Sequence, residues 1–155
     1  MIRGLLIEDD DQKRKDIESH LSATLEITID QACSFQAAKR ALLLGRYDLI
    51  ILDMTLPSFD VSPIESGGST KQLGGKLIMR FLHREEIKCP VIILTRFDTF
   101  PAYDNNISLK ELARVFSVEY SGFFIDAIYY NSSSSEWKAH LTKAISNALK
   151  GNSHV

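Results

Sequence analysis

The chain has 155 residues, of which 45% are hydrophobic and 25% are charged, and this composition fits one globular domain with a core of its own. Its 18 lysines and arginines against 20 aspartates and glutamates give a net charge of −2, so no overall attraction to nucleic acid or to an anionic membrane is expected. The two cysteines, Cys33 and Cys89, are too few for a disulfide framework and lack metal-ligand spacing, so both are expected to be reduced.

Short apolar runs alternate with helix-patterned segments along the chain, which is the pattern of stacked βα units. The first run, residues 2–7, ends in acids and is too short for a signal peptide or a membrane span, so a cytoplasmic protein is expected. The first half of the chain predicts a central strand over 2–7, a helix over 12–25 capped by Asp10 or Asp11, an edge strand over 26–30, a helix from Ser34 to Gly45, and a buried strand over 48–54.

Residues 55–75 interrupt this alternation, because they are rich in Pro, Gly and Ser and have no period. They predict a long loop or insertion, made flexible by Gly67-Gly68 and Gly74-Gly75. The second half predicts a helix containing residues 77–82, a strand over 91–95 and an irregular loop over 96–107. A helix follows from Ser108 to 119, with Glu111 completing its cap, and then a strand over 123–129. The last predicted helix is capped by Ser133 and Glu136 and ends at Gly151.

Five strands and five helices in strict alternation predict an α/β fold, a three-layer doubly wound parallel sheet with helices on both faces. We expect a single domain over residues 1–151, with an insertion at about 55–75, a frayed tail over 152–155 and no appended output domain. In such a sheet, binding sites form at the carboxyl ends of the strands, around the point where the strand order reverses.

Chemistry-bearing side chains follow three of these strands. Glu8 and Asp9 follow the first strand, Asp53 ends the third and Thr95 ends the fourth. Grouped carboxylates need a cation, and Mg²⁺ suits carboxylate and water oxygens while keeping positions open for phosphate. A carboxylate beside such a metal can also act as a nucleophile towards phosphorus, and the Thr95 hydroxyl would lie where it can bond a phosphoryl oxygen.

These segments, GLLIEDDD, YDLIILDMTLP and PVIILT, resemble the acidic pair, the phosphoacceptor loop and the switch threonine of response-regulator receiver domains. The resemblance covers nearly the whole chain and implies a flavodoxin-like (CheY-like) sheet of order 2-1-3-4-5. It implies that Glu8, Asp9 and Asp53 hold Mg²⁺, that Asp53 accepts phosphate, and that Thr95 closes on the phosphoryl group. It also implies a signalling domain rather than an enzyme, with self-catalysed phosphotransfer and autodephosphorylation as its only chemistry.

One family feature is missing. Receivers carry a Lys at the end of the fifth strand, where it pairs with the phosphoryl group, but no Lys occurs between Ser121 and Trp137. Lys71, Lys76 or Arg96 are the candidates for a substitute. Without one, the fold would serve as a pseudo-receiver, a phosphorylation-independent adaptor for protein–protein interaction.

Other classes fit less well. A haloacid-dehalogenase-like phosphatase needs a second Asp two residues after its nucleophile, where this chain has Thr55, and a Toprim enzyme needs a DxD motif that the chain lacks at the corresponding strand end. A flavodoxin binds the FMN phosphate after its first strand, where this chain has acidic residues. The segment around Lys76 does not match the phosphate-loop pattern. The expected partners are a histidine kinase or phosphotransfer protein and a downstream protein of unknown identity, with neither nucleic acid nor membrane. A homodimer through the last helix–strand–helix face is a further candidate assembly.

Overall fold

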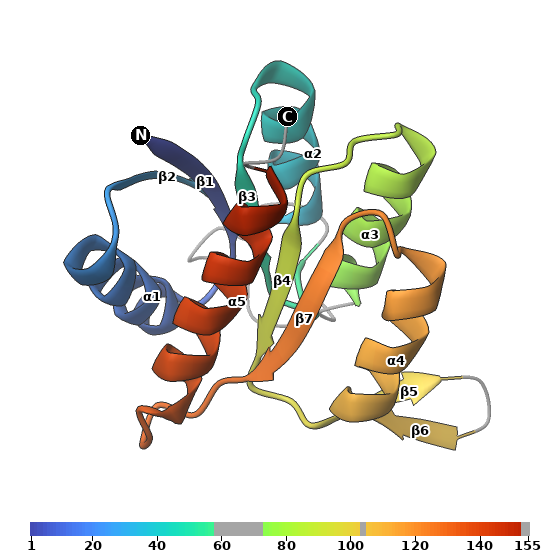
Figure 1. Ribbon diagram of the computed structural model, residues 1–155. Helices are drawn as coiled ribbons and strands as arrows, with labels where there is room; N and C mark the ends of the chain where they lie inside the picture. Colours follow the sequence, from blue (N-terminus) through green and yellow to red (C-terminus); the bar gives the residue numbers. More distant parts are fainter. Residues whose placement is uncertain (58–72, 103–104, 153–155) are drawn as a thin grey trace, which may run out of the picture.

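The computed structural model describes residues 1–57, 73–102 and 105–152. Its centre is a parallel five-stranded sheet of order β2-β1-β3-β4-β7 (Figure 1). The strands are β1 (Ile2–Ile7), β2 (Ile27–Ala32), β3 (Leu49–Leu52), β4 (Val91–Thr95) and β7 (Phe124–Tyr129). Counted along the chain within this sheet, the order is 2-1-3-4-5, so the predicted doubly wound fold is confirmed.

Helices cover both faces of this sheet (Figure 1). They are α1 (Asp11–Thr24), α2 (Phe35–Leu44), α3 (Gly74–Arg84), α4 (Leu109–Glu119) and α5 (Glu136–Asn152). One apolar cluster joins the sheet to α2, α3 and α4, and a second joins its other face to α1 and α5. The inner strands β3 and β4 are buried along their whole length, because helices pack on both of their faces.

The expectation of an irregular loop over residues 96–107 is wrong. This segment contains β5 (Thr99–Ala102) and β6 (Asn105–Ser108), which pair antiparallel beside α4 (Figure 1). Pro101 and the two asparagines of β6 disfavour a strand by propensity. The hairpin is therefore fixed by pairing and by the burial of Phe100, which is 2% exposed.

The loop predicted over 55–75 includes two residues, Gly74 and Gly75, that the structure places in a helix. Gly74 and Gly75 belong to the first turn of α3, where small residues let the helix approach the end of β3 closely. A Cβ on Gly75 would lie 2.5 Å from the Asp53 backbone oxygen, a distance that only glycine avoids. Gly67, Gly68 and Lys71 lie outside the described residues.

Three of the four predicted helix caps are confirmed. The side chains of Asp10, Ser34 and Ser108 accept hydrogen bonds from backbone N–H groups three residues later. The fourth prediction is wrong in its residue, because the N–H of Glu136 donates to the Ser134 hydroxyl, 3.1 Å away, rather than to Ser133. Among the helices of the described ranges, none combines the length and apolar character that crossing a membrane requires.

Candidate functional site at the carboxyl edge of the sheet

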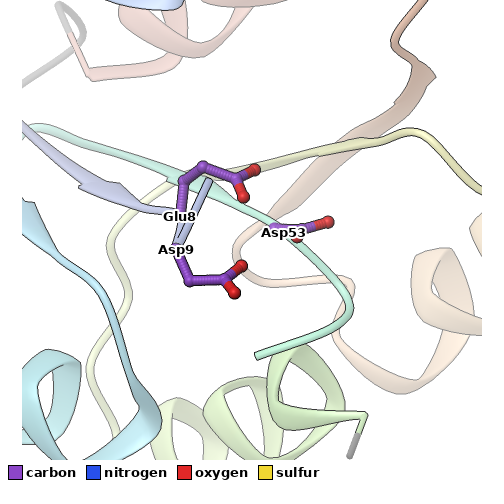
Figure 2. Close-up of side chains that lie close together, drawn as sticks. All are labelled: Glu8, Asp9 and Asp53. Atoms are coloured by element: carbon purple, nitrogen blue, oxygen red, sulfur yellow. The ribbon is translucent and has the colours of Figure 1, made fainter. Parts of the chain in front are cut away.

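The parallel pairing of β1 with β3 brings the predicted acidic residues together. The Asp53 N–H donates to the Ile7 carbonyl at 3.0 Å, which places Asp53 beside the residue that follows β1. Glu8, Asp9 and Asp53 each contribute a carboxylate oxygen to a group in which all three atoms lie within 4.8 Å of one another. Figure 2 shows the three side chains extending to the same side of the strand ends. We call these residues the acidic cluster.

Two members of the acidic cluster are buried: Glu8 is 1% exposed and Asp53 is 5% exposed, whereas Asp9 is partly exposed. Burial, together with the negative charge of Asp53, raises the pKa of Glu8 to about 7, although the ammonium of Lys13 acts in the opposite direction. One Glu8 oxygen accepts the Asp10 N–H at 3.1 Å. The carboxylates thus form a compact region of negative charge with little access to water.

The Asp53 carboxylate is only partly satisfied. Its Oδ2 accepts a hydrogen bond from the Thr55 hydroxyl at 3.3 Å. Its Oδ1 is buried and has no hydrogen-bond partner among the residues that the structure describes. Buried carboxylate oxygens are normally hydrogen-bonded, so Asp53 Oδ1 is an exception, with the Lys13 ammonium 3.4 Å away as its ion-pair partner.

Lys13, which is not among the residues predicted for the site, enters this region from α1. Its side chain is 1% exposed, and its Nζ lies 2.5 Å from Glu8 Oε1 and 3.4 Å from Asp53 Oδ1. A signal was present in the sequence. Ile17 and Leu21 define the buried stripe of α1, and one step of four residues towards the N-terminus reaches Lys13.

The cations named from the sequence take other places. Arg96 lies 3.2 Å from an Asp10 carboxylate oxygen, at the rim of the acidic cluster. Lys76 lies on α3 and forms no ion pair with any residue of the described ranges. Lys71 lies outside those ranges. In the described part of the chain neither Lys76 nor Arg96 forms an ion pair with Glu8 or Asp53, whereas Lys13 pairs with both.

Thr95 ends β4 next to β3, as the sequence predicts. Its side chain is fully buried, and its hydroxyl oxygen accepts a hydrogen bond from the Phe97 N–H at 3.3 Å. The carbonyl of the preceding residue, Leu94, accepts a hydrogen bond from Lys13. Thr95 is thus adjacent in sequence to a backbone group that contacts the lysine of the site.

The donor set of the acidic cluster fits Mg²⁺. Three carboxylates supply the hard oxygen ligands that this ion prefers, and the unsatisfied Asp53 Oδ1 supplies an oxygen with no competing hydrogen bond. With Lys13 included, the four side chains carry a formal charge of −2 when all are ionised, which a divalent ion balances.

Comparison with solved structures identifies the fold. A CheY-like receiver domain from Methanospirillum hungatei superimposes with a TM-score of 0.66 at 15% identity, over 100% of this chain and 99% of that one. The response regulator TrrA from Thermotoga maritima, in complex with Mg²⁺ and BeF, gives a TM-score of 0.60 at 19% identity, over 93% and 99% of the two chains. The fold is that of receiver domains.

The relatives in sequence are full-length matches. The uncharacterized protein y4jR of Sinorhizobium fredii is 31% identical over 152 residues, covering 92% of this chain and 96% of that protein. The Detocs response regulatory protein DtcB of Enterobacter cloacae is 26% identical over 144 residues, covering 91% and 96%. No protein-family model matches the chain. The identity to y4jR over nearly the whole of both chains places this chain in one family with that protein, and its fold is that of response-regulator receiver domains.

Proposed function

We propose that the chain is a receiver that accepts a phosphoryl group on Asp53 in phosphorelay signalling. Asp53 itself carries this proposal, because it is a buried carboxylate at the end of β3, grouped with Glu8 and Asp9. One of its oxygens has no hydrogen-bond partner among the described residues. A carboxylate with a purely structural role would be expected to have both oxygens satisfied.

The reaction needs a nucleophile and a phosphoryl donor, and we take the donor to be the phosphohistidine of a histidine kinase or phosphotransfer protein. A carboxylate oxygen of Asp53 attacks the phosphorus, a P–O bond forms, and the P–N bond breaks with its electron pair leaving on the imidazole. Glu8, Asp9 and Asp53 would hold Mg²⁺, which when bound neutralises charge on the phosphoryl oxygens. The Thr95 hydroxyl would leave the Phe97 N–H and donate to one of these oxygens.

The output of this switch would pass to the face formed by α4, β7 and α5. Movement of Thr95 at the end of β4 reaches β7 directly, since Thr95 pairs with Tyr129 across the two strands. Tyr129 is 48% exposed, and α4 presents Val115 and Val118, which are 42% and 76% exposed. Apolar side chains exposed on this face suit a downstream protein or a second copy of the chain. The cytoplasmic location expected from the sequence stays a prediction.

The test uses two aspartates that bracket the same strand. Asp53 follows β3 and is buried, whereas Asp48 precedes it and is exposed. We expect wild type and Asp48→Asn to bind beryllofluoride in the presence of Mg²⁺, with saturable amide NMR shifts at Glu8, Asp9 and Thr95 that extend to β7. Asp53→Asn should give none of these shifts.

A second measurement tests the covalent step. Incubation with acetyl phosphate should give wild type and Asp48→Asn a hydroxylamine-sensitive phosphoryl adduct that mass spectrometry detects, and Asp53→Asn should not acquire it. If wild type shows neither an adduct nor a beryllofluoride response, the proposed phosphoacceptor function is wrong. The pseudo-receiver alternative would then account for the chain.

A further inference from the structure

The lysine that receivers carry after the fifth strand is absent here, and a different group occupies that end of β7. Tyr130 follows β7, donates its N–H to the Thr95 carbonyl at 2.7 Å and is 5% exposed. Its hydroxyl donates to Asp16 on α1 at 2.5 Å. The Lys13 ammonium lies 5.5 Å from the centre of the Tyr130 ring. A tyrosine thus stands at the strand end, and an ammonium from α1 lies over it.

Lys13 connects three strand ends through one nitrogen atom. Its Nζ lies 2.5 Å from Glu8 after β1, 2.5 Å from the Leu94 carbonyl in β4, and 3.4 Å from Asp53 after β3. A lysine at 1% exposure loses its hydration, which is costly unless its charge is paired. A helix that only packed against the sheet would carry an apolar residue at this position, as it does at Ile17 and Leu21.

The hydrogen-bonding capacity of the ammonium is not exhausted by these contacts. An ammonium has three N–H donors, and Glu8 and the Leu94 carbonyl account for two. The third contact, to Asp53 Oδ1, is longer than a normal hydrogen bond of about 2.7–3.2 Å, and Asp53 Oδ1 has no hydrogen-bond partner among the described residues. A donor is therefore available on the side of the carboxylate that would receive the phosphoryl group.

We propose that Lys13 is the phosphoryl-binding cation of this receiver, delivered from α1 instead of from the end of the fifth strand. This inference rests on the proposed phosphoacceptor function of Asp53. In the unmodified protein, Lys13 neutralises part of the charge of Glu8 and Asp53. Once Asp53 carries a phosphoryl group, the third N–H donates to one of the new oxygens, and the Glu8 and Leu94 contacts hold the ammonium in place.

The experiment compares two lysines on the same helix. Lys13→Met keeps the apolar stem and removes the buried charge, and Lys15→Met removes an exposed charge two residues away. Two titrations are followed by amide NMR for each protein: Mg²⁺ alone, then beryllofluoride at saturating Mg²⁺. We expect Lys13→Met to keep the Mg²⁺ shifts at Asp9 and Asp53 but to bind beryllofluoride about 100-fold more weakly. Lys15→Met should match wild type in both titrations.

The two titrations separate a phosphoryl-binding role from a structural one. If Lys13→Met binds beryllofluoride as tightly as wild type, or loses both responses together while folded, Lys13 is not the phosphoryl-binding cation. If wild type itself fails to bind beryllofluoride, the proposed function fails, and this inference falls with it. A positive wild-type response with an unaffected Lys13→Met overturns the inference alone.

A measurement on wild type covers the case in which Lys13→Met does not fold. The side-chain Nζ resonance of Lys13, assigned through its own side chain, should shift when beryllofluoride is added to the Mg²⁺-saturated protein. The Nζ resonance of Lys15 should not shift. An unchanged Lys13 resonance at full beryllofluoride occupancy would overturn the proposal without any variant.

Discussion

The sheet carries a cluster of charged groups at each end, and the two clusters differ chiefly in their access to water. At the carboxyl end, Lys13 pairs with Glu8 and Asp53, and these side chains are between 1% and 5% exposed. At the amino end, Arg3 pairs with Asp30 at 3.0 Å, and their side chains are 50% and 40% exposed. Both clusters combine one cation with carboxylates.

The hydrogen bonds of the amino-end cluster satisfy its acids. The Tyr47 hydroxyl and the Arg3 guanidinium donate to Asp30, and both lower its pKa. At the carboxyl end, burial raises the pKa of Glu8 and leaves an Asp53 oxygen without a hydrogen-bond partner in the described ranges. A cation beside carboxylates thus gives a solvated ion pair at the amino end and a buried site with one unsatisfied oxygen at the carboxyl end.

The largest expected effect is the loss of the buried cation. Lys13→Met should lower the free energy of unfolding by about 4 kcal/mol in the presence of a chelator, because it leaves two buried carboxylates without their ammonium. Added Mg²⁺ should restore part of this loss in Lys13→Met. Urea unfolding monitored by circular dichroism, with Lys15→Met as the control, measures both quantities. A loss as small as that of the control would show that the buried pairing does not stabilise the fold.

The next effect is the dependence of stability on pH. The pKa of Glu8 is raised to about 7 in the folded protein from 4.5, so the folded state binds more protons than the unfolded state between these values. The contribution of Glu8 to the free energy of unfolding should therefore be largest below about pH 4.5. It should fall by up to about 3 kcal/mol as the pH rises through 7.

Glu8→Gln isolates this contribution. The variant should remove the fall in stability between pH 4.5 and 7, because glutamine does not ionise, whereas Glu26→Gln, on an exposed residue, should keep the wild-type profile. Urea unfolding at several pH values in the presence of a chelator provides the measurement. Identical profiles for Glu8→Gln and wild type would show that Glu8 does not titrate in this range.

A smaller effect is expected from the close packing around Asp53. Gly75→Ala would place a Cβ 2.5 Å from the Asp53 backbone oxygen and 2.6 Å from the Met54 Cα, and overpacking of this kind costs about 2 kcal/mol. At the other end of the sheet, a Cβ on Gly4 would lie 3.2 Å from the flexible end of Ile27 and 3.8 Å, an ordinary contact distance, from the Leu49 backbone oxygen. Gly4→Ala should therefore destabilise the protein less than Gly75→Ala in thermal unfolding. The reverse order would contradict the packing described here.

The smallest effect is expected at the amino end. Arg3→Met removes an ion pair that is exposed to solvent and screened by salt, so the urea unfolding midpoint should differ from wild type by no more than replicate scatter. The beryllofluoride response should be unchanged as well. A destabilisation comparable to that of Lys13→Met would remove the distinction between the two clusters.

Much of the site could be predicted from the sequence because it depends on strand ends. Glu8, Asp9, Asp53 and Thr95 each follow or end an apolar run, and parallel strands bring such positions to one edge. Lys13 was missed because a lysine on an amphipathic helix is normally assigned to the exposed face. Its four-residue spacing from Ile17 was the available signal.

The sequence by itself determined the alternation of strands and helices and the convergence of the acidic residues, because these follow from periodicity and from the rules of parallel connection. The sheet order followed from the resemblance to receiver domains. The tertiary structure alone decided which cation reaches Asp53, where α3 begins, and that residues 99–108 form a hairpin. Each of these outcomes depends on contacts between segments far apart in the chain, such as Lys13 with Leu94. Local sequence patterns carry no information about distances of that kind.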